Sequence, residues 1–500
     1  MSVMQKQPSR LSLWFVLVLI GFFICSVSCQ KPDPSESESF APILGTWYGY
    51  LTLEENKILL SLEFSENPDG GLAASMSVPD FGTDNQPLTQ LSYENGVLSA
   101  RLEEVSGTLS GSLDEQASRL ELELDSELIT SKLSLKRDDG EFSGQLIPRR
   151  NAAGEQELDY TYSIPDKVDD GWDVSSLVDE GLKVALIEDL IRACLDGKTF
   201  PKTDSVLVAR NGKLVCEEYF YRQTREKPHT IQSVTKSVTS MLVGIAVERG
   251  EIESVDQPVF SFFSEYRGRK WIDEKYDITL RDILSMSAGL DWDETTYPYT
   301  DERNDNVAMN KSDDWFGYVL DKGRAFKPGE KFNYCSGLSI LLGGIIKNTT
   351  GLYVDEYAEK YLFGPLGITD YSWFKSPKNI YHTGGGLNLR PIDMLKIGQV
   401  MLDGGTWNGR RILPEKWVKD SIREHARRDE QIQYGYQWWL HTFKTPKGPV
   451  NAAMGKGYGG QFIMIAPKLN LVAVTTALNF KKAGKSWELK FSDYVLPAAQ

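Results

Sequence analysis

The chain has 500 residues, of which 41% are hydrophobic, so it can bury sizeable cores and is expected to contain two or more domains. Its 70 acidic and 55 basic side chains give a formal net charge of −15, and no basic stripe is present, which excludes nucleic acid as the main partner. The four histidines are dispersed and form no zinc signature, so neither a metal nor another cofactor is expected.

Residues 1–29 are predicted to be a lipoprotein signal peptide. A basic start precedes an almost unbroken apolar run over 11–24, and Ser26-Val27-Ser28-Cys29 then resembles a lipobox, in which the cysteine is lipidated. An uncleaved membrane anchor is the alternative, although the run is barely long enough to span a bilayer. Residues 30–40 form a polar tether. We therefore expect an exported bacterial lipoprotein, on the outer membrane or on the periplasmic or cell-surface side, anchored through Cys29.

Residues 41–148 are predicted to be an all-β domain, either a small antiparallel barrel or a sandwich. Apolar and polar residues alternate over 58–64, 72–78 and 120–124, as they do in strands with one buried face. Turn signals such as Glu94-Asn95-Gly96 separate these segments. Two roles stay open for this domain, a structural spacer and a ligand- or partner-binding module.

Residues 149–180 are predicted to be a linker, and residues 181–500 an α+β domain. Strands are expected at 205–210 and 213–220, and again near the end of the chain at 461–466 and 471–478. Helical patterns dominate between these pairs, which indicates one antiparallel sheet built from both ends of the domain, with a helical insertion. The domain's cysteines are too few for a disulfide framework and are expected to be buried thiols: Cys194, Cys216 and Cys335.

Ser233 and Lys236 begin an apolar stretch that runs to Gly250 with helical spacing. Residues three apart lie on one face of a helix, so the two side chains should stand side by side at its N-terminus. A serine hydroxyl becomes nucleophilic when a base removes its proton, and a lysine can do so if burial lowers its pKa from about 10.4. Ser-x-x-Lys also occurs at Ser28 and Ser372, so the motif alone does not identify a catalytic serine. Its meaning at Ser233 depends on the surrounding sequence.

Over about residues 165–490 the chain resembles the serine β-lactamase and penicillin-binding-protein superfamily, most of all its class C and esterase-type branch. The likeness rests on several stretches in a characteristic order: 205–208, 232–237, 284–290, 332–337, 384–387 and 457–461. It implies a transpeptidase-like fold, in which an antiparallel sheet is flanked by helices. The expected architecture is therefore this fold preceded by the small all-β domain.

The resemblance also implies roles for individual residues. Ser233 would be the nucleophile and Lys236 its base, while Tyr334 would share proton transfer, with its phenolate stabilised by Lys236. The oxyanion hole would combine the N–H of Ser233 with that of Tyr458, which follows Gly457. A better match to the family's Tyr-x-Asn pattern, at Tyr93, lies in the β domain at a turn and is set aside.

Two departures from the family pattern argue against antibiotic hydrolysis. Ser336 stands where many members have an asparagine that binds the substrate amide. The Lys-Thr-Gly element is degraded, and its counterpart 455–457 carries Lys456 in the middle. Since a shift of one residue in a strand moves a side chain to the opposite face, Lys456 is expected to miss a β-lactam carboxylate. His382, which precedes Gly384, is interpreted as an exposed loop residue.

The sequence thus predicts a serine hydrolase that forms an acyl-enzyme on Ser233 and acts as an esterase, amidase or peptidase on a small ester, amide or peptide. A true β-lactamase or a D-amino-acid peptidase acting on cell-wall fragments is one alternative. A catalytically silent lipoprotein that binds peptide or glycan is the other. The oligomeric state is not set by the sequence.

Overall fold

The computed structural model describes residues 40–500, apart from short stretches at 54–55, 80–82, 103–106, 127–129, 270–274, 300, 377 and 481–483. The chain divides into two compact units, and the boundary along the sequence falls between Ile147 and Pro148. The predicted signal peptide, including Cys29, and the tether up to residue 39 lie outside the described residues. Among the described residues, no helix combines the length and apolar character needed to cross a bilayer.

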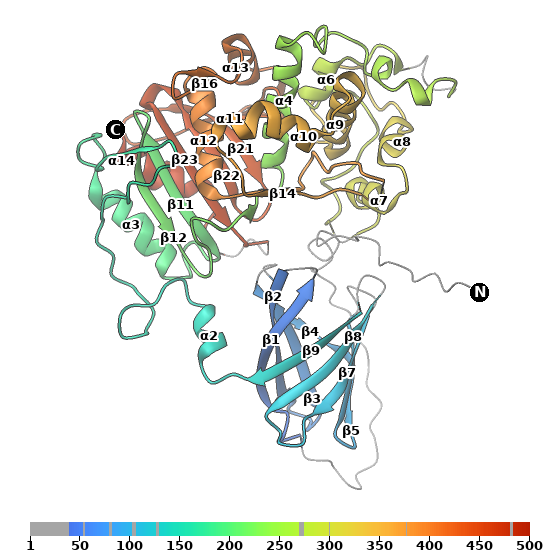
Figure 1. Cartoon of the computed structure of the whole chain (residues 1–500), viewed down its shortest axis with the longest axis vertical. Helices are drawn as coiled ribbons and strands as arrows, with labels where there is room; N and C mark the ends of the chain where they lie inside the picture. Colours follow the sequence, from blue (N-terminus) through green and yellow to red (C-terminus); the bar gives the residue numbers. More distant parts are fainter. Residues whose placement is uncertain are drawn as a thin grey trace. The chain divides into compact units, whose positions relative to one another are not determined.

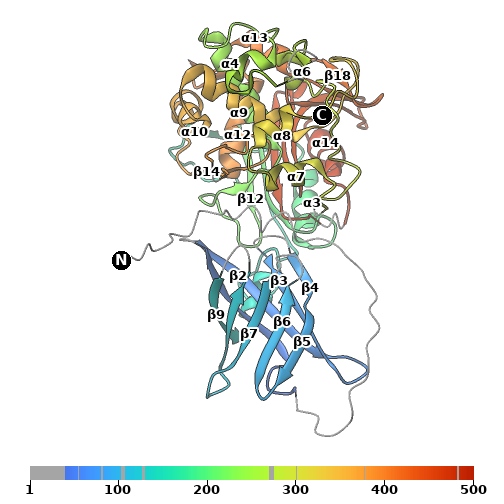
Figure 2. The ribbon, with the colours of Figure 1, turned by 90° about the vertical axis from the view of Figure 1, so that its right-hand side faces the viewer.

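The first unit is a curled antiparallel sheet (Figure 1, Figure 2). Its strands follow the order β4-β3-β2-β1-β9-β8-β7-β6-β5. Side chains alternate between buried and exposed along β6 and β8, and the buried set, which includes Trp47, Leu62 and Leu120, forms one core. The predicted all-β region is therefore confirmed, as a barrel-like sheet. The strands are β1 (Gly45–Leu53), β2 (Asn56–Glu66), β3 (Leu72–Val78), β4 (Thr83–Pro87), β5 (Thr89–Glu94), β6 (Val97–Leu102), β7 (Gly107–Leu113), β8 (Arg119–Asp125) and β9 (Thr130–Arg137), and a short helix, α2 (Glu141–Gln145), follows them.

The second unit is built on a sheet of order β10-β12-β11-β23-β22-β21-β20-β19-β18. All neighbours pair antiparallel except β10 with β12. Strand β11 from the start of the unit pairs with β23 from its end, so the sheet joins both ends of the domain, as predicted. Its strands are β10 (Asp173–Val174), β11 (Thr203–Arg210), β12 (Lys213–Tyr219), β18 (Ala426–Arg427), β19 (Ile432–Tyr434), β20 (Trp439–Phe443), β21 (Val450–Gly457), β22 (Gln461–Ala466) and β23 (Leu471–Ala477).

Both faces of this sheet are buried. Leu207 of β11 belongs to the larger core on one face, while its neighbours Val206 and Val208 belong to a second core on the other. The larger core holds α4 (Val234–Glu248), α9 (Ser336–Thr350) and α12 (Pro391–Leu402). The second holds α3 (Val184–Leu195), η7 (Lys490–Val495) and α14 (Leu496–Ala498), together with the buried thiols of Cys194 and Cys216.

The remaining elements are short and surround these layers. The helices are η3 (Val259–Phe262), η4 (Ser264–Tyr266), α6 (Leu280–Leu284), α7 (Asp305–Lys311), α8 (Trp315–Leu320), α10 (Val354–Ala358), η5 (Glu359–Phe363), α11 (Gly364–Leu366), α13 (Glu415–Ser421) and η6 (Pro467–Leu469). The strands outside the main sheet are β13 (His229–Thr230), β14 (Tyr371–Trp373), β15 (Leu387–Leu389), β16 (Thr406–Trp407) and β17 (Arg410–Arg411).

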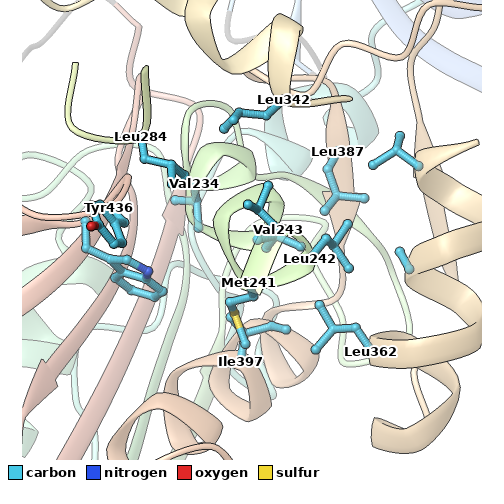
Figure 3. Close-up of a cluster of buried hydrophobic side chains, with 14 of the residues drawn as sticks. Val234, Met241, Leu242, Val243, Leu284, Leu342, Leu362, Leu387, Ile397 and Tyr436 are labelled. Carbon is cyan, nitrogen blue, oxygen red and sulfur yellow. The ribbon is translucent and has the colours of Figure 1, made fainter. Parts of the chain in front are cut away.

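Helix α4, which begins directly after Ser233, is buried on almost every side. Every residue from Val234 to Ala246 is buried, which is the pattern of a core helix rather than of a surface helix with one apolar stripe. Figure 3 shows Met241, Leu242 and Val243 among side chains from α9, α12 and η5. The helix ends before Gly250, whose φ of 71° is the left-handed conformation that stops a helix, as the sequence predicted. The N-terminus of α4 is thus fixed by packing along the whole helix.

We expect Gly435→Ala to destabilise the second unit, because Gly435 lies close to backbone. A Cβ at this position would lie 1.9 Å from the main-chain oxygen of Ser421 in α13. Overpacking of this kind costs about 1–3 kcal/mol. Urea unfolding should show the loss, whereas Gly323→Ala, where the nearest atom would be 3.9 Å away, should unfold like the wild type. Equal stability of the two variants would contradict this packing.

Candidate active site

Ser233 lies at the N-terminal end of α4, directly after a strained residue. Gln232 has a φ of 47°, in the left-handed region that costs a non-glycine residue about 1–2 kcal/mol. Just before it, the N–H of Ile231 donates to the main-chain oxygen of Leu387 at 3.1 Å. The turn therefore presents Ser233 at the start of the helix, where the helix dipole favours negative charge.

Lys236 lies one turn further along α4 and is 1% exposed. Its Nζ donates to Ser233 Oγ at 3.1 Å, to Ser336 Oγ at 2.9 Å and to the main-chain oxygen of Gly384. Burial lowers the pKa of Lys236 to about 8, although the Glu294 carboxylate acts in the opposite direction. A neutral amine beside the serine hydroxyl is therefore accessible near neutral pH.

Glu294 is a buried site residue that the sequence analysis missed. Its Oε2 accepts hydrogen bonds from the N–H of Ser336 at 2.6 Å and from Trp292 Nε1 at 2.9 Å. Its Oε1 accepts from the Ser336 hydroxyl and, at 3.0 Å, from Tyr299 Oη. The one sequence signal for Glu294 was its position soon after the stretch 284–290, which is part of the family resemblance. Ser336 is therefore held between a carboxylate and the amine of Lys236.

This arrangement orients the amine of Lys236. A carboxylate can only accept hydrogen bonds, so the Ser336 hydroxyl must donate to Glu294 and accept from Lys236. The main-chain oxygen of Gly384 also accepts from Lys236. When Lys236 is neutral, these two acceptors take its two N–H bonds, and its lone pair is left to face Ser233 Oγ. The network thus leaves the lysine aligned as a base for the serine proton.

Tyr334 also lies at Ser233, and its surroundings disfavour its ionisation. The ring stacks on Trp439 with centroids 5.7 Å apart, and Lys236 Nζ lies 5.1 Å from the ring centroid. Burial and the Glu294 charge raise the pKa of Tyr334 far above its usual value, while a hydrogen bond with Ser233 lowers it less. This shift runs against the phenolate that the resemblance implied, because desolvation disfavours the charged form of a tyrosine. The share of Tyr334 in proton transfer stays a prediction.

The end of β21 lies against the turn that precedes Ser233. A Cβ on Gly457 would lie 2.4 Å from the main-chain oxygen of Ile231, and one on Gly455 would lie 3.1 Å from Val234 Cγ1. Only glycine allows the strand to approach so closely. Tyr458 follows directly, and its hydroxyl donates to the main-chain oxygen of Phe480 at 2.8 Å. Use of the Tyr458 N–H as an oxyanion donor stays a prediction.

Lys456 alternates to the face of β21 opposite Gly455 and Gly457, but it still lines the same cleft as Ser233, so its displacement along the strand does not remove it from the site. It pairs across the ladder with Phe462, which belongs to the second core. Its Nζ lies 2.9 Å from Oε1 of Glu488 and 5.6 Å from the ring centroid of Trp439. The ammonium therefore has a carboxylate partner within the protein.

The cleft has a volume of about 510 Å³, enough for a small organic substrate. Aromatic rings form much of its wall, and its charged side chains come from β21, from the C-terminal segment and from Arg428, between β18 and β19. Its lining residues are Ser233, Tyr299, Tyr334, Arg428, Trp439, Lys456, Gly457, Tyr458, Phe462, Gly484, Lys485, Ser486, Trp487 and Glu488. In the part of the chain that the structure describes, no group of three or more histidine, cysteine or acidic side chains is arranged to hold a metal ion.

His382 is buried, so its interpretation as an exposed loop residue is wrong. Its ring packs edge-on against Trp315 with centroids 5.5 Å apart, and it is 1% exposed. A Cβ built on Gly384 would lie 3.5 Å both from His382 Cε1 and from Lys236 Nζ. Burial, with the charge of Lys236, lowers the pKa of His382 to about 3, so the imidazole is neutral. The neutral ring therefore adds no charge to the surroundings of Lys236.

The chain belongs to the beta-lactamase family, whose sequence model matches residues 187–486. The 6-aminohexanoate-dimer hydrolase of Paenarthrobacter ureafaciens is 26% identical over 295 residues, which cover 54% of this chain and 71% of that protein. The Escherichia coli protein named beta-lactamase is 22% identical over 223 residues, 43% of this chain and 53% of its own length. These matches confirm the predicted superfamily and make the protein a hydrolase of the β-lactamase serine-hydrolase type.

Solved structures confirm the predicted fold of the second unit. A putative beta-lactamase from Bacteroides dorei superposes with a TM-score of 0.53 at 20% identity, covering 64% of this chain and 99% of that one. A putative 6-aminohexanoate-dimer hydrolase from Bacillus anthracis gives a TM-score of 0.50 at 23% identity, covering 60% and 79%. At these identities the likeness shows the fold alone.

We expect Lys236 to titrate near pH 8 and Glu294→Gln to move this titration to lower pH. The substitution removes a negative charge that favours the protonated amine, while burial continues to favour the neutral one. NMR of the Cε groups of 13C-labelled lysine would follow the titration, with the Lys236 signal assigned by its loss in Lys236→Arg. Glu253→Gln removes an exposed carboxylate and should leave the titration in place. An unchanged midpoint in Glu294→Gln would contradict the coupling.

Proposed function

We propose that this protein hydrolyses small linear amides or esters through an acyl-enzyme on Ser233. One observation carries the proposal: a buried lysine with its pKa lowered to about 8 lies 3.1 Å from the hydroxyl of a serine at a helix N-terminus. A nucleophile within hydrogen-bond reach of a base, which is itself oriented by further groups, is the general arrangement of covalent acyl transfer. Glu294 and Ser336 are the orienting groups here.

In the first half of the reaction, neutral Lys236 takes the proton of Ser233 while Oγ attacks the carbonyl carbon of the substrate. The negative charge on the carbonyl oxygen is held by the N–H groups of Ser233 and Tyr458. The bond to the leaving group then breaks, and that group departs with a proton passed on from Lys236. Water attacks the acyl-enzyme in the second half, which releases the acid and restores the Ser233 hydroxyl and the neutral lysine.

Tyr334 would act in this cycle as a phenol. Its raised pKa keeps it protonated, so it can donate a hydrogen bond to the departing nitrogen or oxygen, while the transferred proton comes from Lys236. Its stacking on Trp439 fixes the direction of the hydroxyl. Lys236 is thus the base of the acylation step, and Tyr334 assists the leaving group.

Linear amides are favoured over β-lactams by the pairing of two polar groups at the site. Ser336 is occupied by Glu294 and Lys236, and Lys456 by Glu488, so neither presents itself freely to a β-lactam amide or carboxylate. The relative from Paenarthrobacter is named as a 6-aminohexanoate-dimer hydrolase, and two amino acids are joined through an amide. A β-lactamase, a D-amino-acid peptidase and a catalytically silent binding lipoprotein are the alternatives that the following experiment separates.

Ser233→Ala should lower the turnover of p-nitrophenyl acetate and of a linear 6-aminohexanoyl amide by about a thousandfold or more, because the nucleophile is removed. Ser372→Ala is the matched control, since Ser372 also begins a Ser-x-x-Lys sequence but lies on β14. A fluorophosphonate should label the wild type and Ser372→Ala but not Ser233→Ala.

A chromogenic cephalosporin and a D-alanyl peptide, assayed in parallel, identify the substrate class. Cephalosporin or D-alanyl turnover far above that of the linear amide would replace this proposal by one of the enzyme alternatives. If the wild type is as inert as Ser233→Ala and takes no fluorophosphonate, the binding lipoprotein replaces it.

We also propose that the protein is exported and lipidated on Cys29, on the basis of its lipobox-like sequence. Metabolic labelling with radioactive palmitate in a bacterial host should mark the wild type, and Cys29→Ser should take no label. Cys25→Ser, four residues upstream, is the matched control and should be labelled. A membrane-bound wild type without label would favour the uncleaved anchor.

A further inference from the structure

Lys456 and Glu488 form an ion pair within the wall of the cleft. The side chains are 20% and 34% exposed, and the two atoms lie 2.9 Å apart. Burial raises the pKa of Glu488, but attraction to Lys456 and the hydrogen bond from Ser486 outweigh it and lower that pKa to about 2. Both partners are therefore charged, and the pair as a whole is neutral.

This pair lies on the path that a substrate bound at Ser233 would follow along β21. Lys456 directly precedes Gly457, whose backbone lies against the turn before Ser233. The same cleft is lined by Ser233, Lys456 and Glu488. A group attached to the reacting carbonyl and extended over this strand end would therefore meet the charges of the pair.

An unpaired ammonium at this position would attract a carboxylate on the substrate. Glu488 removes that attraction in two ways: it cancels the charge of Lys456, and it repels any further carboxylate that approaches. The aromatic surface of Trp439 beside Lys456 accepts uncharged groups without such a penalty. The wall formed by β21 thus discriminates by charge.

We propose that Glu488 is a specificity-determining residue, which makes the cleft disfavour acyl derivatives that carry a carboxylate beside the scissile bond. This inference rests on the acyl-transfer function proposed above. It adds to that function a substrate class and a residue from the C-terminal segment. Two further cations line the cleft: Arg428, which is about half exposed and lies 3.8 Å from Asp429, and Lys485, which is exposed. Both contribute screened charges that are the same for every variant compared here.

The test compares two esters of the same size that differ in one charge, 3-carboxyphenyl acetate and 3-carbamoylphenyl acetate. The quantity measured is the ratio of their kcat/KM values, anionic over neutral. In Glu488→Gln this ratio should rise about fivefold to tenfold, the scale of one charge-assisted contact. In the double variant Lys456→Met with Glu488→Gln the ratio should fall back toward that of the wild type, because the unmasked ammonium is gone.

Glu415→Gln is the matched control, since it removes one carboxylate from an exposed ion pair on α13 and should leave the ratio unchanged. An unchanged ratio in Glu488→Gln, with the neutral ester still hydrolysed, would overturn the inference while leaving the acyl-transfer function intact. An equal rise in Glu415→Gln would also overturn it, because the effect would then come from overall charge. If neither ester is hydrolysed by the wild type, the acyl-transfer function fails, and the inference fails with it.

Discussion

The removal of one lysine side chain from water is the constraint on which the site depends. Desolvation lowers the pKa of Lys236 toward neutrality, and without it the amine would remain a cation that cannot accept a serine proton. Burial of a charge is tolerated only when its hydrogen bonds are satisfied, and Ser233, Ser336 and Gly384 provide three acceptors. The negative charge of Glu294 favours the protonated amine, and so it offsets part of the free-energy cost of burying the ammonium. The balance of these two effects sets the reactivity of Ser233.

The fold supplies this environment through packing that is remote from the chemistry. Helix α4 is enclosed along its length, so its first turn cannot move toward solvent to hydrate Lys236. The glycines of β21 let the strand approach the turn at Gln232, and the side chain between them is directed to the opposite face. A larger residue at either glycine would separate the strand from the helix. The backbone strain at Gln232 is held in place by this same packing.

Sequence patterns predicted the elements whose information is local. The apolar spacing after Ser233, the stop at Gly250 and the alternation in the first unit each depend on neighbouring residues, and the structure has a helix and strands there. Strand alternation also predicted that Lys456 faces away from its two neighbouring glycines, but not that it lines the same cleft as Ser233. Glu294, His382 and Glu488 could not be assigned in this way, because their roles come from contacts across the fold: Glu294 reaches Ser336, 42 residues away. The raised pKa of Tyr334 could not be foreseen either, because desolvation cannot be deduced from a short motif.

The pairing of β11 with β23 has a consequence for how the chain acquires its structure. Residues 203–210 can pair only after residues 471–477 have been made, so the ribosome has to release nearly the whole chain before the central part of the sheet can close. The first unit is made of strands that mostly pair with their immediate successors, and its contacts become available early. The two units of this protein can therefore fold at different stages of its synthesis. The barrel-like sheet can form while the chain is still emerging, whereas the hydrolase unit stays open until its last strands arrive, and its nucleophile and base come together only then.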